Sequence, residues 1–194
     1  MKYSILFSPT VSGKKNKIIN LLPYGEERGG ADSVLLQQMT KLSFDDIYME
    51  LAQTLARKSH CVVMKVGAVI SRDTRIVSLG YNGPPAGTHN CDEEWPGVGC
   101  PRDLKGGCSL ALHAEANAIL YASKNQVTLD KATLYITLSP CLPCARIIYT
   151  VGIKRVIYLD SYAHYKGIKK DEGLDFLSKF GVEVIKYEKQ LVPN

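Results

Sequence analysis

Residues 113–144, HAEANAILYASKNQVTLDKATLYITLSPCLPC, decide the fold and carry most of the reactive side chains. The Ala- and Leu-rich run 110–120, which overlaps their start, predicts a helix. The β-branched and aromatic run 133–138 predicts a strand. Cys141 and Cys144 follow this strand at an i, i+3 spacing, which places both side chains on one face of the first turn of a second helix. The stretch therefore predicts helix, strand and helix in succession.

A metal site is the chemistry that this pattern favours. His113, Cys141 and Cys144 offer one imidazole nitrogen and two thiolates, and three such ligands leave the fourth position of a tetrahedral zinc site open for water. A helix N-terminus also lowers the pKa of a thiol, which favours the thiolate that zinc requires. Glu115 is left to act on substrate rather than on metal. The alternatives are a core histidine beside a chance C-x-x-C and a redox C-x-x-C, and both are disfavoured because the two half-motifs flank one strand.

The composition is that of an ordinary globular protein. The 194 residues suit one domain, with 45% hydrophobic and 22% charged residues. A net charge of +5 and a pI of about 8.8 agree with an anionic substrate but are too weak to indicate nucleic acid. No apolar run approaches the roughly 20 residues of a membrane span and no signal peptide is recognisable, so the sequence predicts a cytoplasmic protein. In that compartment the six cysteines are better explained as metal ligands than as disulfides.

Residues 1–43 stand apart from the rest of the chain. The runs 3–7 and 17–22 have strand-like composition on either side of the polar segment 12–16. They predict an N-terminal extension, either a hairpin appended to the domain or a mobile tail, and no function follows from its residues. The domain itself is expected to span residues 44–194.

The domain is expected to open with a helix and a hairpin. Ser43 has the chemistry of an N-cap, with acidic residues behind it, for a helix that runs to about Ser59. Its apolar stripe is expected at Ile47, Leu51, Thr54, Leu55 and Lys58. The runs 66–70 and 75–80 predict strands of an antiparallel hairpin, because their residue types are strand-like and the loop between them is short.

The end of the chain predicts parallel strands. Strands are expected at 155–159 and 182–187, around a helix at 171–180 that Gly181 caps. Strand–helix–strand units imply parallel pairing with helices packed on the sheet. The expected fold is α/β, a three-layer α/β/α sandwich around a five-stranded mixed sheet.

From about Phe44 to Tyr187 the chain resembles the deoxycytidylate (dCMP) deaminases of the cytidine deaminase superfamily. The pair H-x-E and P-C-x-x-C is typical of the zinc-dependent nucleobase deaminases in general. The narrower resemblance rests on Lys65-Val66-Gly67-Ala68-Val69-Ile70, Gly80-Tyr81-Asn82-Gly83 with Pro85 and Gly87, Asn117-Ala118-Ile119, Ser139-Pro140-Cys141 with Cys144, and Gly152-Ile153-Lys154. Residues 1–43 fall outside it.

The resemblance implies hydrolytic deamination of dCMP to dUMP and ammonia. It places His113, Cys141 and Cys144 on a catalytic Zn²⁺. It makes Glu115 the acid and base that takes the proton of the attacking water, protonates ring N3 and helps ammonia leave.

The expected substrate contacts are Asn82, Ala114, Ser139, Tyr158 and Tyr162, and the resemblance itself implies Asn82. Asn82 would hold a sugar hydroxyl, the alternative being that Asn82-Gly83 is only a turn pair. The two tyrosines have the chemistry to stack on the base or to bind the phosphate. Cationic partners for the phosphate are expected among Lys65, Arg102 and Lys166, although such residues are more often solvated surface charges.

A second, structural Zn²⁺ is also expected. Residues 80–112 predict a long irregular segment, which a compact domain rarely carries unless something holds it. Many dCMP deaminases hold this region to the end of the first helix with zinc, and the ligands expected here are Cys61, Cys91, Cys100 and Cys108. His60 or His89 is a possible replacement for one of them. The alternative is four buried free cysteines.

Regulation and assembly follow from the resemblance alone. The family consists of homo-oligomers, often hexamers, that are activated by dCTP with Mg²⁺ and inhibited by dTTP. The effector site is expected at Gly80, Tyr81, Asn82 and Gly83, near backbone N–H groups that would cradle a triphosphate.

Three other functions compete with this hypothesis. They are a tRNA adenosine deaminase with the same zinc site, a deaminase of another free cytosine nucleotide, and a zinc-stabilised binding module without activity. The modest net charge of +5 argues against the first, and the intact Glu115 argues against the last.

Overall fold

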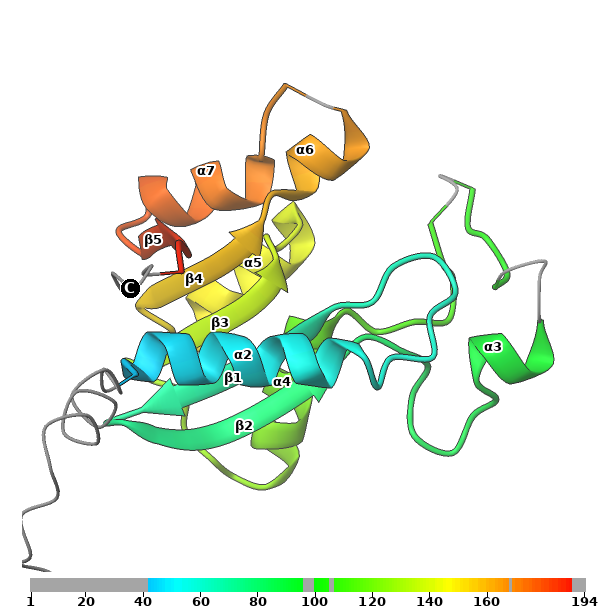
Figure 1. Cartoon of the computed structure of the whole chain (residues 1–194), viewed down its shortest axis with the longest axis horizontal. Helices are drawn as coiled ribbons and strands as arrows, with labels where there is room; N and C mark the ends of the chain where they lie inside the picture. The colour runs from blue at the N-terminus through cyan, green and yellow to red at the C-terminus, as the bar shows by residue number, and fades with distance from the viewer. Residues whose placement is uncertain (1–41, 96–99, 105–106, 168, 190–194) are drawn as a thin grey trace, which may run out of the picture. The chain divides into compact units, whose positions relative to one another are not determined.

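The computed structural model describes residues 42–95, 100–104, 107–167 and 169–189 (Figure 1). The hairpin or tail predicted for residues 1–43 lies outside this part of the chain, apart from its last two residues. Among the described residues, no helix combines the length and the apolar character needed to cross a membrane. The helices and strands are α2 (Phe44–Ala56), β1 (Gly67–Arg72), β2 (Arg75–Tyr81), α3 (Cys91–Glu94), α4 (Ala114–Lys124), β3 (Thr133–Leu138), α5 (Leu142–Thr150), β4 (Arg155–Asp160), α6 (Tyr162–Lys166), α7 (Glu172–Lys179) and β5 (Glu183–Lys186).

A mixed sheet of five strands organises the domain, in the order β2-β1-β3-β4-β5. β1 is antiparallel to both β2 and β3, whereas β3, β4 and β5 are parallel to one another. The turn between β1 and β2 holds Asp73 and Thr74 at φ 49° and 59°, and positive φ at both central residues suits the twist of a hairpin. α5 and α7 provide the crossovers that parallel strands require. The predicted hairpin and five-stranded mixed sheet are confirmed.

Helices cover both faces of the sheet, which confirms the predicted sandwich (Figure 1). Ala68 and Ile70 of β1 point to the face that α4, α5 and α7 cover, where the larger core lies. Val69, between them, points to the opposite face and packs against Met49 and Ala52 of α2. This alternation is the two-residue period of a strand that is buried on both faces.

The start of the first helix is predicted correctly, but its buried stripe only in part, since Leu51 and Leu55 pack partly buried against the core and the rest of the stripe is exposed. Ser43 caps α2, since its hydroxyl accepts from the backbone N–H of Asp46, 3.1 Å away. The face that α2 buries consists of Asp46, Tyr48, Met49, Ala52 and Ala56, and Ile47 of the predicted stripe is 42% exposed. The helix crosses β1 so closely that a Cβ on Gly67 would overlap the carbonyl oxygen of Ala52. Close approach therefore selects small side chains rather than the most apolar stripe.

The helix predicted at 110–120 also begins later than expected. α4 starts at Ala114 because Leu112 pairs with Gly83 in both directions, at 2.9 and 3.1 Å, and this keeps the preceding residues extended. The late start turns His113 into the N-cap residue of α4. Two short helices, α3 and α6, were not predicted, because segments of four and five residues carry no clear periodicity.

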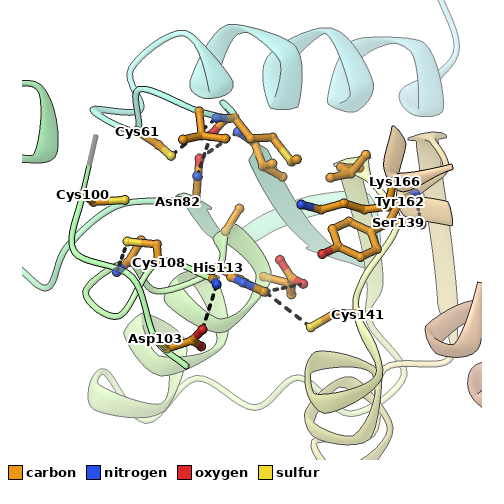
Figure 2. A pocket seen from close by; sticks show the side chains of 18 of the residues that line it. Cys61, Asn82, Cys100, Asp103, Cys108, His113, Ser139, Cys141, Tyr162 and Lys166 are labelled. Atoms are coloured by element: carbon orange, nitrogen blue, oxygen red, sulfur yellow. Dashed lines mark hydrogen bonds and ion pairs between the residues drawn. The ribbon is translucent and has the colours of Figure 1, made fainter. Parts of the chain in front are cut away.

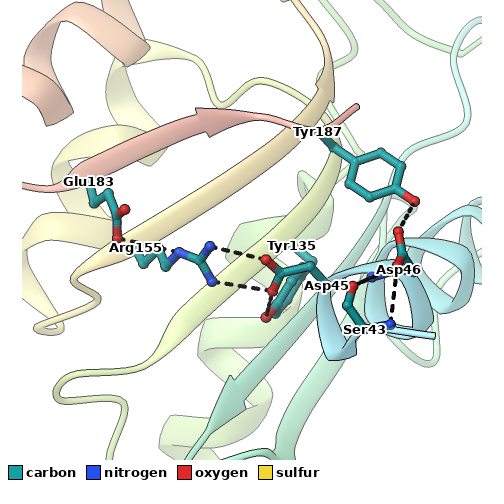
Figure 3. A network of polar contacts seen from close by, with 7 residues as sticks. All are labelled: Ser43, Asp45, Asp46, Tyr135, Arg155, Glu183 and Tyr187. Atoms are coloured by element: carbon teal, nitrogen blue, oxygen red, sulfur yellow. Dashed lines mark hydrogen bonds and ion pairs between the residues drawn. The ribbon is translucent and has the colours of Figure 1, made fainter. Parts of the chain in front are cut away.

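A polar network ties the start of α2 to three strands (Figure 3). The carboxylate of Asp45 accepts two hydrogen bonds from the Arg155 guanidinium, at 3.0 and 3.2 Å, and one from the Tyr135 hydroxyl, at 2.7 Å. Arg155 also pairs with Glu183 of β5 at 3.3 Å. Paired hydrogen bonds to one guanidinium fix orientation as well as distance. The network therefore fixes how α2 lies across β3, β4 and β5.

Asp46 should make stability depend on pH. Hydrogen bonds from Ser43 and Tyr187 hold the pKa of Asp46 below its ordinary value of 3.8. A lowered folded-state pKa adds stability above the unfolded-state value, and that stability is lost as the pH falls through the folded-state pKa. We expect Asp46→Asn to lower the free energy of unfolding by about 1 kcal/mol at pH 7, with the difference shrinking below pH ~4. Chemical denaturation at pH 7 and pH 3 measures this, and an equal loss at both pH values would contradict it.

Candidate active site and metal centre

A cavity of about 310 Å³ lies where the end of β3 meets the starts of α4 and α5 (Figure 2). Ala114 and Glu115 enter it from α4, and Ser139 and Cys141 enter it from the turn after β3. The irregular segment before α4 and the helix α6 form further walls. Of the residues predicted from sequence, those on the metal motif are thus brought together.

The distances between the predicted catalytic ligands fit a zinc ion. The Nδ1 atom of His113 lies 3.4 Å from Sγ of Cys141 and 3.5 Å from Sγ of Cys144. Zinc bonds of about 2.3 Å to sulfur and about 2.1 Å to nitrogen, in a tetrahedron, place such ligands about 3.6 Å apart. One carboxylate oxygen of Glu115 also lies within 4.8 Å of these atoms. The three donors therefore surround one point from one side, with Glu115 beside it.

The protonation of these side chains is that of a cation site. A hydrogen bond from Cys144, assisted by His113, lowers the pKa of Cys141 to about 4. The hydrogen bond between His113 and Cys141 raises the pKa of His113 to about 9. The Cys144 thiol, which donates to Cys141 and is buried, has a raised pKa. Protons thus lie where a divalent cation would lie, and metal binding releases them.

Glu115 has the environment of an acid–base group. Its side chain is only 4% exposed, and burial raises the pKa of its carboxyl group. His113 opposes this shift, because Nδ1 lies 3.9 Å from a carboxylate oxygen of Glu115. A carboxyl group whose pKa is raised by burial can take up and return a proton near neutral pH.

The predicted structural site is assembled in part. Sulfur atoms of Cys91, Cys100 and Cys108 lie within 4.8 Å of one another. Cys61 is buried and lines the catalytic cavity, but it does not belong to this group of three. Burial, with smaller contributions from the neighbouring thiols, raises the pKa of Cys91 to about 12. Buried thiols this close together are the environment that a soft cation relieves.

The two histidines considered as replacements face carboxylates instead. Nδ1 of His60 lies 2.8 Å from Asp92, and Nδ1 of His89 lies 3.6 Å from Glu94. Neither histidine belongs to the group of three sulfurs. Cys61 is therefore the better candidate for a fourth ligand.

Asn82 lines the cavity and is held rigidly. Its side-chain oxygen accepts from the backbone N–H of Val66, and its amide nitrogen donates to the carbonyl of Met64, both at 2.8 Å. The side chain is not part of a simple turn, since it fastens the segment before β1 to the end of β2. One amide N–H and one oxygen lone pair stay available by valence for a substrate hydroxyl.

The other predicted substrate contacts divide into two groups. Ala114, Ser139 and Tyr162 line the cavity, whereas Tyr158 does not appear among its described lining residues. Tyr158 is partly buried and packs against the core on the α4 side of the sheet, so its position does not support a substrate contact, which stays a prediction. Ser139 is only 3% exposed, and its hydroxyl is engaged by the protein, which indicates support rather than substrate binding.

Two of the three predicted phosphate partners reach the cavity. Arg102 and Lys166 line it from opposite walls, the irregular segment and α6. Lys65 instead lines a second cavity, of about 440 Å³, beside Gln53 of α2 and Thr137 of β3. The position of Lys65 therefore does not support a phosphate contact in the first cavity, and its role stays a prediction.

The backbone N–H groups that were expected to bind a triphosphate effector are engaged within the protein. The backbone N–H of Asn82 donates to Val66 at 3.0 Å, and that of Gly83 donates to Leu112 at 3.1 Å. Gly80 and Tyr81 belong to β2 and pair with β1, so the segment Gly80–Gly83 offers little free backbone. A Cβ on Gly80 would lie 2.7 Å from the carbonyl oxygen of Ala114, so this glycine serves close packing.

Asp171 and Gly173 are the site residues that sequence reasoning missed. Both lie at the start of α7 and contact the Ser139–Cys141 turn. An acidic N-cap and a glycine in a first helical turn were the available signals, and neither points to a partner far away in sequence.

The fold and the open His-Cys-Cys site define the class of zinc-dependent nucleobase deaminases. Residues 42–160 match the family model described as the cytidine and deoxycytidylate deaminase zinc-binding region. The match covers more than half of the 194 residues, and the chain belongs to this family.

Named relatives support the assignment. The deoxycytidylate deaminase of Mycobacterium phage D29 is 39% identical over 132 residues, which cover 62% of this chain and 97% of that protein. The deoxycytidylate deaminase of Schizosaccharomyces pombe is 41% identical over 127 residues, but the match spans only 38% of its length. A crystal structure of the dCMP deaminase from cyanophage S-TIM5, in complex with dCMP and dUMP, superposes with a TM-score of 0.62 at 32% identity and covers 76% of this chain and 99% of that chain.

Proposed function

We propose that this chain deaminates dCMP, with water, to dUMP and ammonia in the cytoplasm. The observation that carries the proposal is the buried Glu115 beside three donors spaced for tetrahedral zinc, in a cavity of nucleotide size. The choice of dCMP as the substrate rests on the phage and yeast relatives that are named deoxycytidylate deaminases.

The residues have distinct roles in this reaction. His113, Cys141 and Cys144 would hold zinc, which supplies an ionised water nucleophile at neutral pH when bound. Glu115 would carry one proton of the attacking water to ring N3 of cytosine. It would then carry the second proton of that water, from the hydroxyl group now on C4, to the amino nitrogen, which leaves as ammonia as the C4–O double bond forms. Its burial keeps the carboxyl group from exchanging the proton with bulk solvent.

Two cationic side chains at the cavity walls suit a nucleotide, although Asp103 lines the same cavity. Arg102 and Lys166 bring two cationic side chains to the cavity, and a phosphate monoester is a matching anion. Tyr162, beside Lys166 on α6, offers an aromatic ring and a hydroxyl group. We therefore propose that Arg102 and Lys166 both bind the phosphate group of the substrate.

A substrate panel tests the proposal. Ammonia release would be measured with dCMP, CMP, dCTP, deoxycytidine and a tRNA anticodon stem, using zinc-loaded protein. We expect dCMP to have the highest kcat/KM. Preference for the tRNA would instead favour an adenosine deaminase, a class that is also represented among similar folds at 26% identity and a TM-score of 0.50.

We also propose a structural zinc at Cys91, Cys100 and Cys108, with Cys61 as the fourth ligand. Metal analysis should give two zinc ions per chain, because the two donor groups are separate. Cys100→Ser should leave one zinc and lower the melting temperature, since the metal would hold a segment with little core. One zinc per chain in the wild type, unchanged in Cys100→Ser, would contradict this site.

Allosteric control and assembly complete the proposal. A homo-oligomer, hexameric as in many dCMP deaminases, would respond to dCTP with Mg²⁺ as activator and to dTTP as inhibitor. Because the N–H groups of Asn82 and Gly83 are engaged, an effector at Gly80–Gly83 would bind through side chains or through adjacent residues. The substrate assay repeated with each triphosphate tests this directly.

A further inference from the structure

One carboxylate joins three elements next to the active site. An oxygen of Asp171, Oδ2, accepts hydrogen bonds from the hydroxyl groups of Ser139, at 2.5 Å, and Ser161, at 3.0 Å. The other oxygen, Oδ1, accepts from the backbone N–H of Leu174 at 3.4 Å and caps α7. We name the three side chains of Asp171, Ser139 and Ser161 the Asp171 clasp. It links the turn before the metal ligand Cys141 to the starts of α6 and α7.

The clasp determines where α6 lies. Ser161 is the N-cap residue of this helix, and the backbone N–H of Tyr162 donates to the Ser139 hydroxyl at 2.7 Å. α6 spans only five residues, too few for a helix to be stable without outside contacts. Its position therefore depends on the hydrogen bonds at its start.

α6 presents two side chains to the substrate cavity (Figure 2). Tyr162 and Lys166 both line the cavity, and the Lys166 ammonium lies 5.8 Å from the centre of the Tyr162 ring. Asp171 itself is not among the described lining residues. Apart from the effect of its charge, Asp171 therefore acts on a ligand through the residues that it holds.

We propose that Asp171 is a positioning residue that makes the site selective for a phosphate-bearing nucleotide, by holding α6 so that Lys166 and Tyr162 meet the phosphate. This rests on the proposed function. It differs from simple capping of α7, because capping would affect stability without distinguishing between ligands with and without a phosphate.

A positioning role and a purely electrostatic role of Asp171 predict opposite changes in phosphate affinity. Asp171→Asn removes a negative charge near an anion site, so electrostatics alone would strengthen phosphate binding. Loss of the clasp would weaken it, because Lys166 and Tyr162 would no longer be held in place. Ser161→Ala removes the link to α6, together with the cap that the Ser161 hydroxyl gives this helix by accepting from the His164 N–H at 3.4 Å. It leaves the Ser139 and Leu174 contacts of Asp171 intact.

Calorimetric titration of the zinc-loaded full chain with dUMP and with deoxyuridine tests the proposal. These ligands differ only in the phosphate, and binding is measured without turnover. For both Asp171→Asn and Ser161→Ala we expect the Kd of dUMP to rise about tenfold, while that of deoxyuridine changes less than about twofold. Asp175→Asn makes the same charge change on an exposed position of α7 and should leave both Kd values unaltered.

Each other outcome has a defined meaning. Equal weakening of dUMP and deoxyuridine, or unchanged dUMP binding in Ser161→Ala, overturns the positioning role. Wild-type protein that binds dUMP no more tightly than deoxyuridine also overturns it. Wild-type protein that binds dUMP selectively but does not release ammonia from dCMP overturns the proposed function and leaves the clasp supported. Zinc content and melting temperature, recorded for every variant, identify a variant that has not folded, and Ser161→Ala then decides the test.

Discussion

Replacement of Glu115 by Gln is expected to abolish deamination while the metal ligands stay in place. The amide keeps the shape of the carboxylate but cannot carry a proton between water, ring N3 and the leaving nitrogen, a role that contributes about 10²–10⁴-fold to turnover. His113, Cys141 and Cys144 are unchanged, so zinc content should equal that of the wild type. The measurement is kcat for dCMP together with metal analysis of the same sample.

Stability provides a second signature of this variant. Glu115 is 3% exposed, and a buried carboxylate costs free energy that a neutral amide with hydrogen bonds does not. The melting temperature of Glu115→Gln should therefore equal or exceed that of the wild type. Glu188→Gln, on an exposed position, should leave both activity and zinc unaltered. Near-normal turnover of the zinc-loaded Glu115→Gln protein would remove Glu115 from the mechanism.

The strands were predictable because their determinants are local. The run 133–138 coincides with β3, and the hairpin from Gly67 to Tyr81 follows from two apolar runs and a short turn. The crossovers at α5 and α7 then required parallel pairing in the rest of the sheet. The hairpin and the parallel pairing thus needed no long-range information beyond the sequence of elements, whereas the order of the strands and the antiparallel pairing of β1 with β3 were not predicted.

Helix faces and helix starts were less predictable because distant residues determine them. α2 buries Ala52 and Ala56 since Gly67 of β1 lets the backbones approach, and this outweighs the apolar stripe that includes Ile47. Similarly, the pairing of Leu112 with Gly83 delays the start of α4. Neither contact has a signature within the segment that it changes.

The same distinction applies to the active site. The proposed metal ligands and Glu115 lie in two short motifs with fixed spacing, and the fold brings their donor atoms within 4.8 Å of one another. The support for these motifs comes from Asp171, which lies far along the chain from Ser139 and is joined to it only by the fold. Tyr158, in contrast, lies on a strand that leads to the site, but its side chain packs into the core.

Gly173→Ala is expected to damage both stability and metal binding. A Cβ at this position would overlap the carbonyl oxygen of Pro140 and would lie 2.9 Å from its carbonyl carbon. Backbone atoms cannot rotate away as a side chain can, so α7 or the turn that carries Cys141 has to move. The cost should be about 3 kcal/mol, at the top of the usual range for overpacking, which lowers the melting temperature by roughly 6–12 °C.

Zinc content and dUMP binding should show whether the turn that carries Cys141 or α7 has moved. If the turn moves, Cys141 leaves its place 3.4 Å from His113, and the catalytic zinc and turnover are lost together. If α7 moves, the Asp171 clasp opens, and binding of dUMP weakens while zinc is kept. Gly83→Ala is the matched control, because nothing lies within 4 Å of a Cβ there, and its melting temperature should stay close to that of the wild type. A Gly173→Ala protein with unchanged melting temperature, zinc content and dUMP affinity would mean that α7 does not pack against Pro140.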